Sequence, residues 1–411
     1  MRGTKALTSS RMSSSPTGLP FSSTRYRKAL SPVQLAYLFV LYEIAGVITN
    51  LSAGWVAARF GLTSTLYAGL SLQVLALLAL TQLDPAWSIT ASVVFVMLVQ
   101  GLSGVAKDLA KMSSKSAVKI LAPATGGGLF RWVATLTGSK NAVKGSGFLL
   151  GAVLLAAFGF VPSVLTMAAV LFVILIGVMT GMPKGLPVGR KDAKFSEVFS
   201  KNRNINWLSA ARLFLFGARD VWFVVGLPIY FYAVLSDGTT ESNRTAFFMI
   251  GTFMAAWTIL YGIVQGSAPR ILKAASQSDA EILTLAKRWV GLLVIVPAFL
   301  AGLVWLAPEP SNVLTVTIVL GLLVFGGTFA VNSALHSFLI LSLTDAKRVT
   351  MDVGFYYMAN SVGRLVGTVL SGFTYQMGGL SLCLGTATLM IGLGWLGTSQ
   401  LKAPKTAKVA A

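Results

Sequence analysis

Ionisable side chains recur inside apolar stretches of this chain, where they could bind an anion or carry a proton. The stretch 206–234 contains Arg212, Arg219 and Asp220, and Arg219 falls near its middle. Arg212 and Arg219 are seven residues apart, so they share one face of a helix. Charge inside a membrane span is costly, which makes these residues candidates for a functional site. Alternatively, Arg219 and Asp220 only join helices, and Arg212 extends to the membrane surface.

A second polar stripe is predicted in the stretch 352–376. Tyr356, Asn360 and Arg364 follow one another at intervals of four, and Tyr357 lies seven residues before Arg364. This spacing brings the side chains to one face of a helix, with Arg364 at mid-depth. The stripe could bind a ligand, or its tyrosines and asparagine could form ordinary hydrogen bonds between helices.

A carboxylate is predicted at similar depth in the stretch 33–53. Glu43 lies near its centre, and Asn50 follows seven residues later on the same face. Glu43 could carry a proton, or it could neutralise a buried arginine. If transport is driven by proton antiport, Glu43 and Asp220 are the candidates for proton coupling.

A row of lysines continues the apolar stretch 87–106. If the helices on either side extend inward, these lysines line a cavity; if they do not, the lysines are solvated loop charges. Spacing alone leaves both interpretations open. The row consists of Lys107, Lys111, Lys115 and Lys119, and after a glycine turn come Lys140, Asn141 and Lys144.

The predicted interior holds more basic than acidic groups. Because a buried cation needs an anion, the surplus predicts that the missing anion is the cargo. Arginine binds phosphate or carboxylate oxygens through its planar fork, and lysine acts as a point charge. We therefore expect a small polyanion, held at mid-depth by Arg219 and Arg364. The expected entry route and accessory contacts are Arg212, Lys107, Lys111, Lys140, Lys144, Asn141, Asn360 and Tyr357.

These side chains belong to a chain that is apolar from end to end. Of 411 residues, 55% are hydrophobic and 11% are charged, and the mean hydropathy is +0.75. Soluble domains carry about 25% charged residues, so this composition predicts a membrane protein. The single cysteine and single histidine argue against a disulfide framework or a multi-histidine metal centre. Phosphate-binding and dinucleotide-binding motifs are also missing, and we expect no metal and no cofactor.

Apolar runs of about 20 residues predict an all-α multipass protein with eleven spans. Nearly all Lys and Arg lie in alternate links, whereas the intervening links carry only Arg244. The positive-inside rule makes the basic links and the C-terminus cytoplasmic, in a cell, inner or organelle membrane. The net charge of +20 is then mainly a topology signal, and nucleic acid is not expected. The spans are 33–53, 64–82, 87–106, 145–161, 163–182, 206–234, 245–266, 289–307, 312–342, 352–376 and 380–400.

An internal repeat predicts two pseudo-symmetric helix bundles. The turn 54–59 after the first span is similar to the turn 265–270 after the seventh. At the offset of 211 between these turns, the counterpart of 206–234 would fall at about −5 to 23, where the chain has only polar sequence, so the plan is twelve helices without the first. A truncated gene model, a transit-peptide-like segment and a working eleven-span protein all remain open. The predicted organisation is a disordered basic, Ser-rich tail 1–30, bundle 31–182 with five spans, cytoplasmic linker 183–205, bundle 206–400 with six spans, and cytoplasmic tail 401–411.

Two sets of residues carry a resemblance to known transporters. Gly54-Trp-Val-Ala-Ala-Arg59-Phe-Gly61 resembles the loop signature of the major facilitator superfamily, with Ala58 where an aspartate is usual. More specifically, the chain resembles the organoarsenical efflux permeases of the ArsJ family from about residue 30 to 400. The stretches that carry this likeness are 102–115, 137–145, 208–225 and 261–270, including the charged runs Lys107-Asp108 and Arg219-Asp220.

The resemblance implies efflux of 1-arseno-3-phosphoglycerate in arsenate resistance. It also implies a functional pairing with a glyceraldehyde-3-phosphate dehydrogenase, which makes that compound when arsenate replaces phosphate. Transport would proceed by alternating access of the two bundles. The alternatives are an organophosphate–phosphate exchanger, a non-transporting membrane protein, or an inactive fragment. We expect a monomer in membrane lipid with a small anionic substrate, and no enzyme, because no nucleophile–base set is visible.

Overall fold

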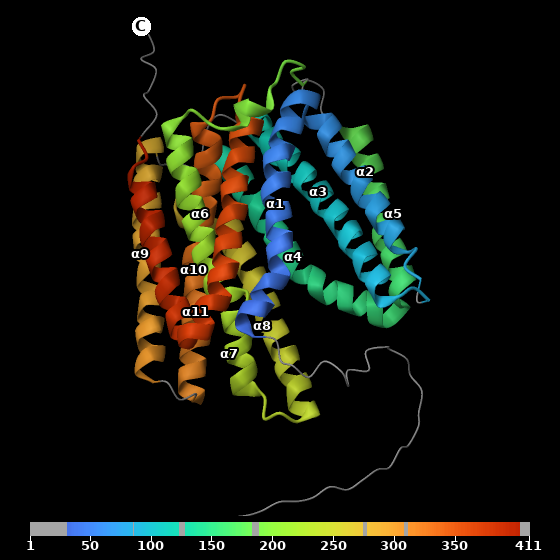
Figure 1. Ribbon diagram of the computed structural model, residues 1–411. Coiled ribbons are helices and arrows are strands. Elements are labelled where there is room, and N and C mark those ends of the chain that lie inside the picture. Colours follow the sequence, from blue (N-terminus) through green and yellow to red (C-terminus); the bar gives the residue numbers. More distant parts are fainter. Residues whose placement is uncertain are drawn as a thin grey trace, which may run out of the picture.

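The computed structural model of the chain is a bundle of helices (Figure 1). The structure describes residues 31–402, except 85, 123–127, 183–188, 274–277 and 308–310. Within these ranges it contains eleven α-helices, one short 3-10 helix and no strand. The expectations for residues 1–30 and 403–411 lie outside the described residues.

Most of the helices are long and apolar. Seven helical segments of the described chain are long and apolar enough to cross a membrane. The protein is therefore an integral membrane protein, as the composition predicts. The helices are α1 Pro32–Phe60, α2 Leu62–Leu80, α3 Ile89–Leu121, α4 Gly128–Phe158, α5 Phe160–Gly181, η1 Phe195–Val198, α6 Arg203–Phe223, α7 Gly226–Leu235, α8 Thr240–Ile271, α9 Asp279–Leu306, α10 Asn312–Leu343 and α11 Val349–Ser399.

The predicted spans fall on these helices, with differences in where they join. The span 145–161 passes the end of α4 at Phe158 and enters α5. The span 206–234 is divided between α6 and α7. The spans 352–376 and 380–400 together form α11, which is interrupted by non-helical backbone at Gly378 and Gly379. Gly379 has φ 60°, a conformation that glycine adopts without a steric penalty. Thr374 Oγ1 lies 3.2 Å from Cys383 Sγ, so the two parts of α11 fold back on each other.

The helices before and after the 183–205 link meet through glycine contacts. A Cβ on Gly54 of α1 would lie 2.8 Å from the carbonyl oxygen of Thr350 in α11. A Cβ on Gly138 of α4 would lie still closer to α8, 2.6 Å from the carbonyl oxygen of Gly262. Small residues permit such close helix packing in membranes. These contacts lie toward the end formed by residues 59–62, 189–202 and 344–349, which we call the linker end (upper end in Figure 1).

The α4–α8 contact does not continue toward the opposite end. Gly138 and Gly145 of α4 pack against α8, but a Cβ on Gly147 or Gly151 would meet no heavy atom within 4 Å among the described residues. In Figure 1, α4 runs diagonally away from α8 toward α5. The two halves are therefore closed together at the linker end and diverge beyond it.

The segment 189–199 crosses the closed linker end. The indole Nε1 of Trp55 in α1 donates to the carbonyl oxygen of Ala193 at 3.1 Å. The guanidinium of Arg348, beside the start of α11, donates to the carbonyl oxygen of Glu197 at 2.8 Å. This segment therefore contacts both halves of the molecule.

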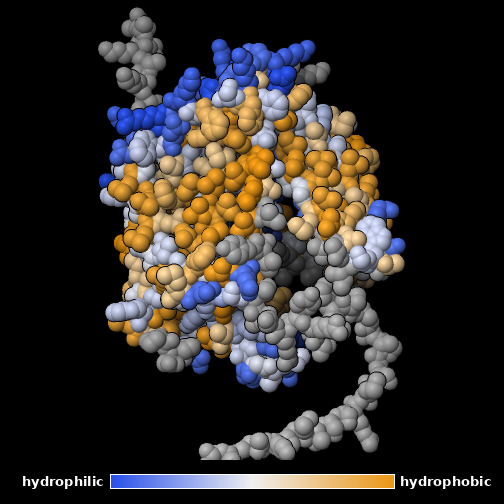
Figure 2. All heavy atoms as spheres, viewed as in Figure 1, coloured by the Kyte–Doolittle hydropathy of each residue, from blue (hydrophilic) through white to orange (hydrophobic). Residues whose placement is uncertain are grey.

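The side of the bundle carries a broad apolar surface, and hydrophilic residues gather at the linker end (Figure 2). Large apolar side chains such as Leu98 and Phe299 are more than half exposed in this belt. A surface of this kind is suited to lipid rather than to water. Figure 2 also shows that the surface is hollowed beside the part of the molecule that contains α2, α3 and α5.

Candidate functional site

The lysine row lies on helix, not on loop. α3 begins after Ser88, whose side chain caps the backbone N–H of Ala91, and it continues unbroken to Leu121. α4 then begins at Gly128. The helices on either side of the glycine turn are therefore extended, and the lysines are not loop charges. A spacing of four residues brings successive lysines to one side of α3.

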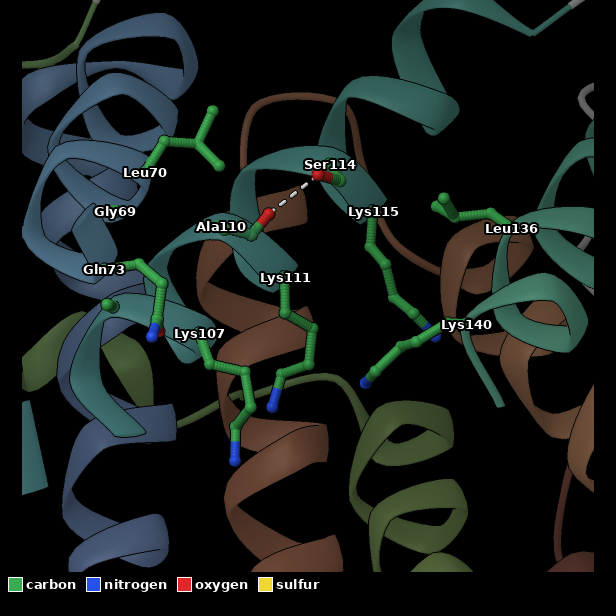
Figure 3. A pocket seen from close by; sticks show the side chains of 11 residues that line it. Gly69, Leu70, Gln73, Lys107, Ala110, Lys111, Ser114, Lys115, Leu136 and Lys140 are labelled. Atoms are coloured by element: carbon green, nitrogen blue, oxygen red, sulfur yellow. Dashed lines mark hydrogen bonds between the residues drawn. The ribbon is translucent and has the colours of Figure 1, made fainter. Parts of the chain in front are cut away.

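A cavity of about 360 Å³ lies between α2, α3 and α4 (Figure 3). In Figure 3, Lys107 and Lys111 point from α3 to the same side, and the ends of Lys115 and Lys140 approach the same space from α3 and α4. Lys144 lies one turn beyond Lys140 and is exposed. The lining residues are Gly69, Leu70, Gln73, Ala106, Lys107, Ala110, Lys111, Ser114, Lys115, Leu136 and Lys140.

Two arginines and two carboxylates form the central ion cluster, defined as Glu43, Arg219, Asp220 and Arg364. Arg219 Nε donates to Asp220 Oδ1 at 2.6 Å. Arg364 Nε donates to the other oxygen of Asp220 at 3.2 Å, and its terminal nitrogen pairs with Glu43. The cluster joins α6 and α11 to α1, so it connects the two halves.

Arg219 and Arg364 are both paired with carboxylates, so they do not belong to the surplus of cations, and their binding of the cargo stays a prediction. Asp220 and Glu43 are 1% and 3% exposed, and in this position they neutralise both guanidinium groups. The sequence left open whether Glu43 is an arginine partner or a proton carrier. In the structure Glu43 is paired with Arg364. Proton coupling through Glu43 or Asp220 stays a prediction. Arg364 still has 30% of its side chain exposed, so a ligand can reach it.

A buried arginine lies two helical turns closer to the linker end. Arg212 is 3% exposed. Its Nε donates to Asn360 Oδ1 at 2.9 Å, and Nη1 donates to Ser333 Oγ at 3.2 Å. The guanidinium also lies 3.8 Å from the ring centroid of Phe216. It therefore does not extend to the membrane surface, and its close contacts are neutral.

Lys115, one member of the lysine row, is a further functional candidate. It is 6% exposed. Its ammonium donates to the Tyr357 hydroxyl and, at 3.2 Å, to Thr137 Oγ1. Tyr357 belongs to α11, so this contact crosses between the halves. The interval of four already groups Lys115 with Lys107 and Lys111, but it gives no sign of the contact with Tyr357, which is 242 residues away.

Lys111 has a different environment from Lys115. Its ammonium pairs with Asp108 Oδ1 at 2.7 Å and also contacts Asn50. The amide of Asn50 donates to Asp108 at 3.2 Å and to Ser361 of α11 at 3.0 Å. Lys111 is therefore neutralised, and Asn50 takes part in another contact between the halves.

A hydrogen-bonded chain of neutral residues completes the region near Arg212. Asn141 of α4 donates to Gln265 of α8 at 2.6 Å, and Gln265 donates to Ser333 of α10 at 2.9 Å. Gln265 is completely buried and was not predicted as a site residue. Its role depends on a partner 124 residues away, which no local sequence pattern indicates.

The interior therefore retains a surplus of positive charge after every pair is counted. In the part of the chain that the structure describes, no carboxylate lies within 4 Å of four of the predicted interior cations, nor of Lys115. Lys107 contacts the Tyr42 hydroxyl at 3.0 Å instead. Groups of three or more potential metal ligands are also missing from the described residues. The unpaired cations are Lys107, Lys115, Lys140, Lys144 and Arg212.

Solved transporter structures are similar to this fold over most of its length. A bacterial homologue of the iron transporter ferroportin in an outward-facing state is 14% identical, covers 90% of both chains, and has a TM-score of 0.70. The human organic anion transporter MFSD10 is 15% identical over 89% of this chain and 84% of its own, with a TM-score of 0.62. The Escherichia coli fucose:proton symporter FucP is 14% identical over 91% and 93%, with a TM-score of 0.65.

These likenesses define the fold class. The chain has the fold of the major facilitator transporters, which its loop signature predicts. No protein-family model matches the chain, and no curated protein matches its sequence. Identities of this size concern the fold alone, so what the chain transports has to be argued from the site.

Proposed function

We propose that the protein is a secondary transporter that moves a small organic polyanion by alternating access. The observation that carries this proposal is a group of five cations in and around the cavity with no carboxylate within 4 Å among the described residues. Two of them, Lys115 and Arg212, are buried, and the other three are exposed. An ion removed from water costs several kcal/mol unless it is paired. A mobile anion that enters the cavity supplies the missing pairing.

The positions of these cations support a route rather than a single contact. Lys107 and Lys140 line the cavity, and Lys144 continues the row along α4. Arg212 and Lys115 lie deeper, close to the closed linker end. The positive-inside rule orients the linker end toward the cytoplasm. In that orientation the structure is an outward-open state, and separation of α1 from α11 and of α4 from α8 opens the cytoplasmic side.

The cargo that we propose is 1-arseno-3-phosphoglycerate, exported in arsenate resistance. The resemblance of residues 102–115, 137–145, 208–225 and 261–270 to organoarsenical permeases supports it. The charge of the site supports it independently, because phosphate and arsenate groups are strong acceptors for lysine and arginine. MFSD10, which has the same fold, is described as an organic anion transporter.

Inside-out membrane vesicles test this function directly. The vesicles receive glyceraldehyde 3-phosphate, NAD, arsenate and a glyceraldehyde-3-phosphate dehydrogenase, and trapped arsenic is measured. We expect accumulation only when the dehydrogenase and the transporter are both present. Accumulation that does not depend on the dehydrogenase would show transport of arsenate itself and would contradict the proposed cargo.

The same vesicles separate the alternative functions. If arsenic enters only vesicles preloaded with phosphate, the protein is an organophosphate–phosphate exchanger. If a proton gradient of the right sign is sufficient, the coupling is proton antiport. No accumulation in correctly oriented vesicles would favour a non-transporting membrane protein.

A further inference from the structure

Polar and basic groups occur at two levels along the helices that line the interior. On α6, Arg219 belongs to the central ion cluster and Arg212 lies seven residues nearer the linker end. On α3, Lys107 and Lys115 are eight residues apart. A separation of seven or eight residues is about 10–12 Å along a helix. Two helices from different halves therefore each present a cation at both levels.

The two levels differ in whether carboxylates of the protein lie beside the basic side chains. At the first level, Glu43 and Asp220 neutralise the arginines of the central ion cluster. At the second level, Lys115 and Arg212 are more than nine-tenths buried, and no carboxylate of the described residues lies within 4 Å of either. Their partners are hydroxyl and amide oxygens. Dipoles of this kind only partly replace the water that a buried cation loses.

We propose that Lys115, Arg212 and Lys140 form a second anion subsite. One anionic group of the cargo occupies this subsite, and another lies at the level of Lys107 and Arg364. The subsite rests on the proposed function, because it assumes that the interior receives an anion. In this subsite, Lys115 binds one anionic group of the cargo.

The cavity supports a single ligand that spans both levels. Its lining includes Lys107 at the first level and Lys111, Lys115 and Lys140 toward the second, whereas Arg212 and Arg364 lie outside the lining (Figure 3). Lys111 is already neutralised by Asp108, so it adds little attraction for a ligand. The matching ligand class is a short molecule with an oxyanion group at each end. A molecule with one oxyanion group leaves one level without its anion.

The second subsite also depends on the closure of the linker end. Lys115 of α3 is held by Tyr357 of α11, and Asn141 of α4 is joined through Gln265 to Ser333, which contacts Arg212. These contacts connect the two halves, so separation at the linker end dismantles the subsite. An anion bound there stabilises the closed linker end relative to the open one.

Binding of two synthetic probes to the purified full chain tests the subsite. The probes are propyl phosphate, with one phosphate group, and 1,3-propanediol bisphosphate, with two. Calorimetry should give an affinity for the bisphosphate roughly tenfold higher or more, as expected for additional charged hydrogen bonds. Lys115→Met and Arg212→Gln should bring the two affinities to about the same level, because only one phosphate-binding level then remains.

Two variants protect the test against misfolding. Lys140→Gln should show the same selective loss of bisphosphate affinity. Lys140 is exposed in the cavity, so its replacement does not disturb packing. Lys191→Met, in the exposed linker segment, is the matched control and should bind both probes normally.

The possible results separate the subsite from the proposed function. Equal affinities for the two probes, or an equal loss of both in Lys140→Gln, would overturn the second subsite while anion binding stands. Binding of neither probe to the unaltered chain would overturn the proposed function and the subsite together.

Discussion

The central ion cluster and the pair Lys115 and Arg212 use the same residue types two helical turns apart, but their charges are handled differently. Arg219 and Arg364 are joined to Asp220 and Glu43. Lys115 and Arg212 contact only hydroxyl, amide and aromatic groups at close range among the described residues. Basic residues inside one membrane protein can therefore join helices through ion pairs at one level and bind a ligand at another.

The difference has opposite consequences for stability. Removing one member of a buried ion pair leaves the other charge buried without compensation, which is strongly destabilising. Removing a buried cation that has no anion relieves a desolvation cost. Substitutions at the two levels should therefore change the free energy of unfolding in different directions, even where both abolish transport.

The largest loss is expected for Asp220→Ala. Asp220 accepts from both Arg219 and Arg364 and is 1% exposed, so its removal leaves two guanidinium groups with one carboxylate. We expect a loss of about 3–5 kcal/mol in unfolding free energy. Denaturant unfolding in detergent measures it, with Asp192→Ala in the exposed linker segment as the control. A stability equal to that of the control would mean that the cluster does not hold the helices together.

A smaller loss is expected for Gly138→Ala at the contact of α4 with α8. The added methyl group would collide with the backbone of Gly262 and Gly266. Overpacking of this kind costs about 1–3 kcal/mol. Gly151→Ala on the same helix meets open space, so the higher helix propensity of alanine should leave its stability unchanged or slightly raised. Thermal unfolding of both variants compares them, and equal shifts would argue against a tight contact at the linker end.

A comparable or smaller loss is expected for Glu43→Gln. The amide keeps the shape of the side chain but removes the charge that pairs with Arg364, and Arg364 retains Asp220. Because the Arg364 side chain is 30% exposed, solvent reduces the effect to roughly 1–2 kcal/mol. A double-mutant cycle with Arg364→Gln measures the coupling. A coupling energy near zero would show that the contact between α1 and α11 depends on packing alone.

The smallest stability change is expected for Lys115→Met. The substitution removes a buried ammonium and keeps most of the apolar stem, so the unfolding free energy should change by less than about 0.5 kcal/mol or increase. Transport in the vesicle assay should nevertheless fall steeply. A large loss of stability would show that Tyr357 and Thr137 already satisfy this charge. Removing a basic side chain would then lower the free energy of unfolding at both levels.

The sequence predicts the helical spans well because each apolar run has the length of a membrane crossing. The residues of the central ion cluster were also identifiable, since a charge inside an apolar run is conspicuous. Their pairing with one another was only one of the open alternatives. Whether Lys107 to Lys119 lay on helix or loop could not be decided, because spacing of four fits an extended helix and a solvated surface equally.

The remaining site residues depend on long-range contacts. Gln265 matters because Asn141 and Ser333 lie beside it, and neither is near it in the sequence. Lys115 contacts Tyr357, which is 242 residues away, whereas Lys111 pairs with Asp108 only three residues before it. Helical spacing indicates the second contact. The first follows from how the two halves pack, which residue periodicity does not encode.

Arsenic uptake by the variant Lys107→Gln/Lys140→Gln/Lys144→Gln tests most directly whether unpaired cations in the cavity hold an anionic cargo. The three lysines are exposed and no described carboxylate lies within 4 Å of them, so the variant should fold and reach the membrane in normal amounts. In inside-out vesicles with the dehydrogenase present, we predict that dehydrogenase-dependent arsenic accumulation disappears. Accumulation at the rate of the unaltered protein would contradict the account.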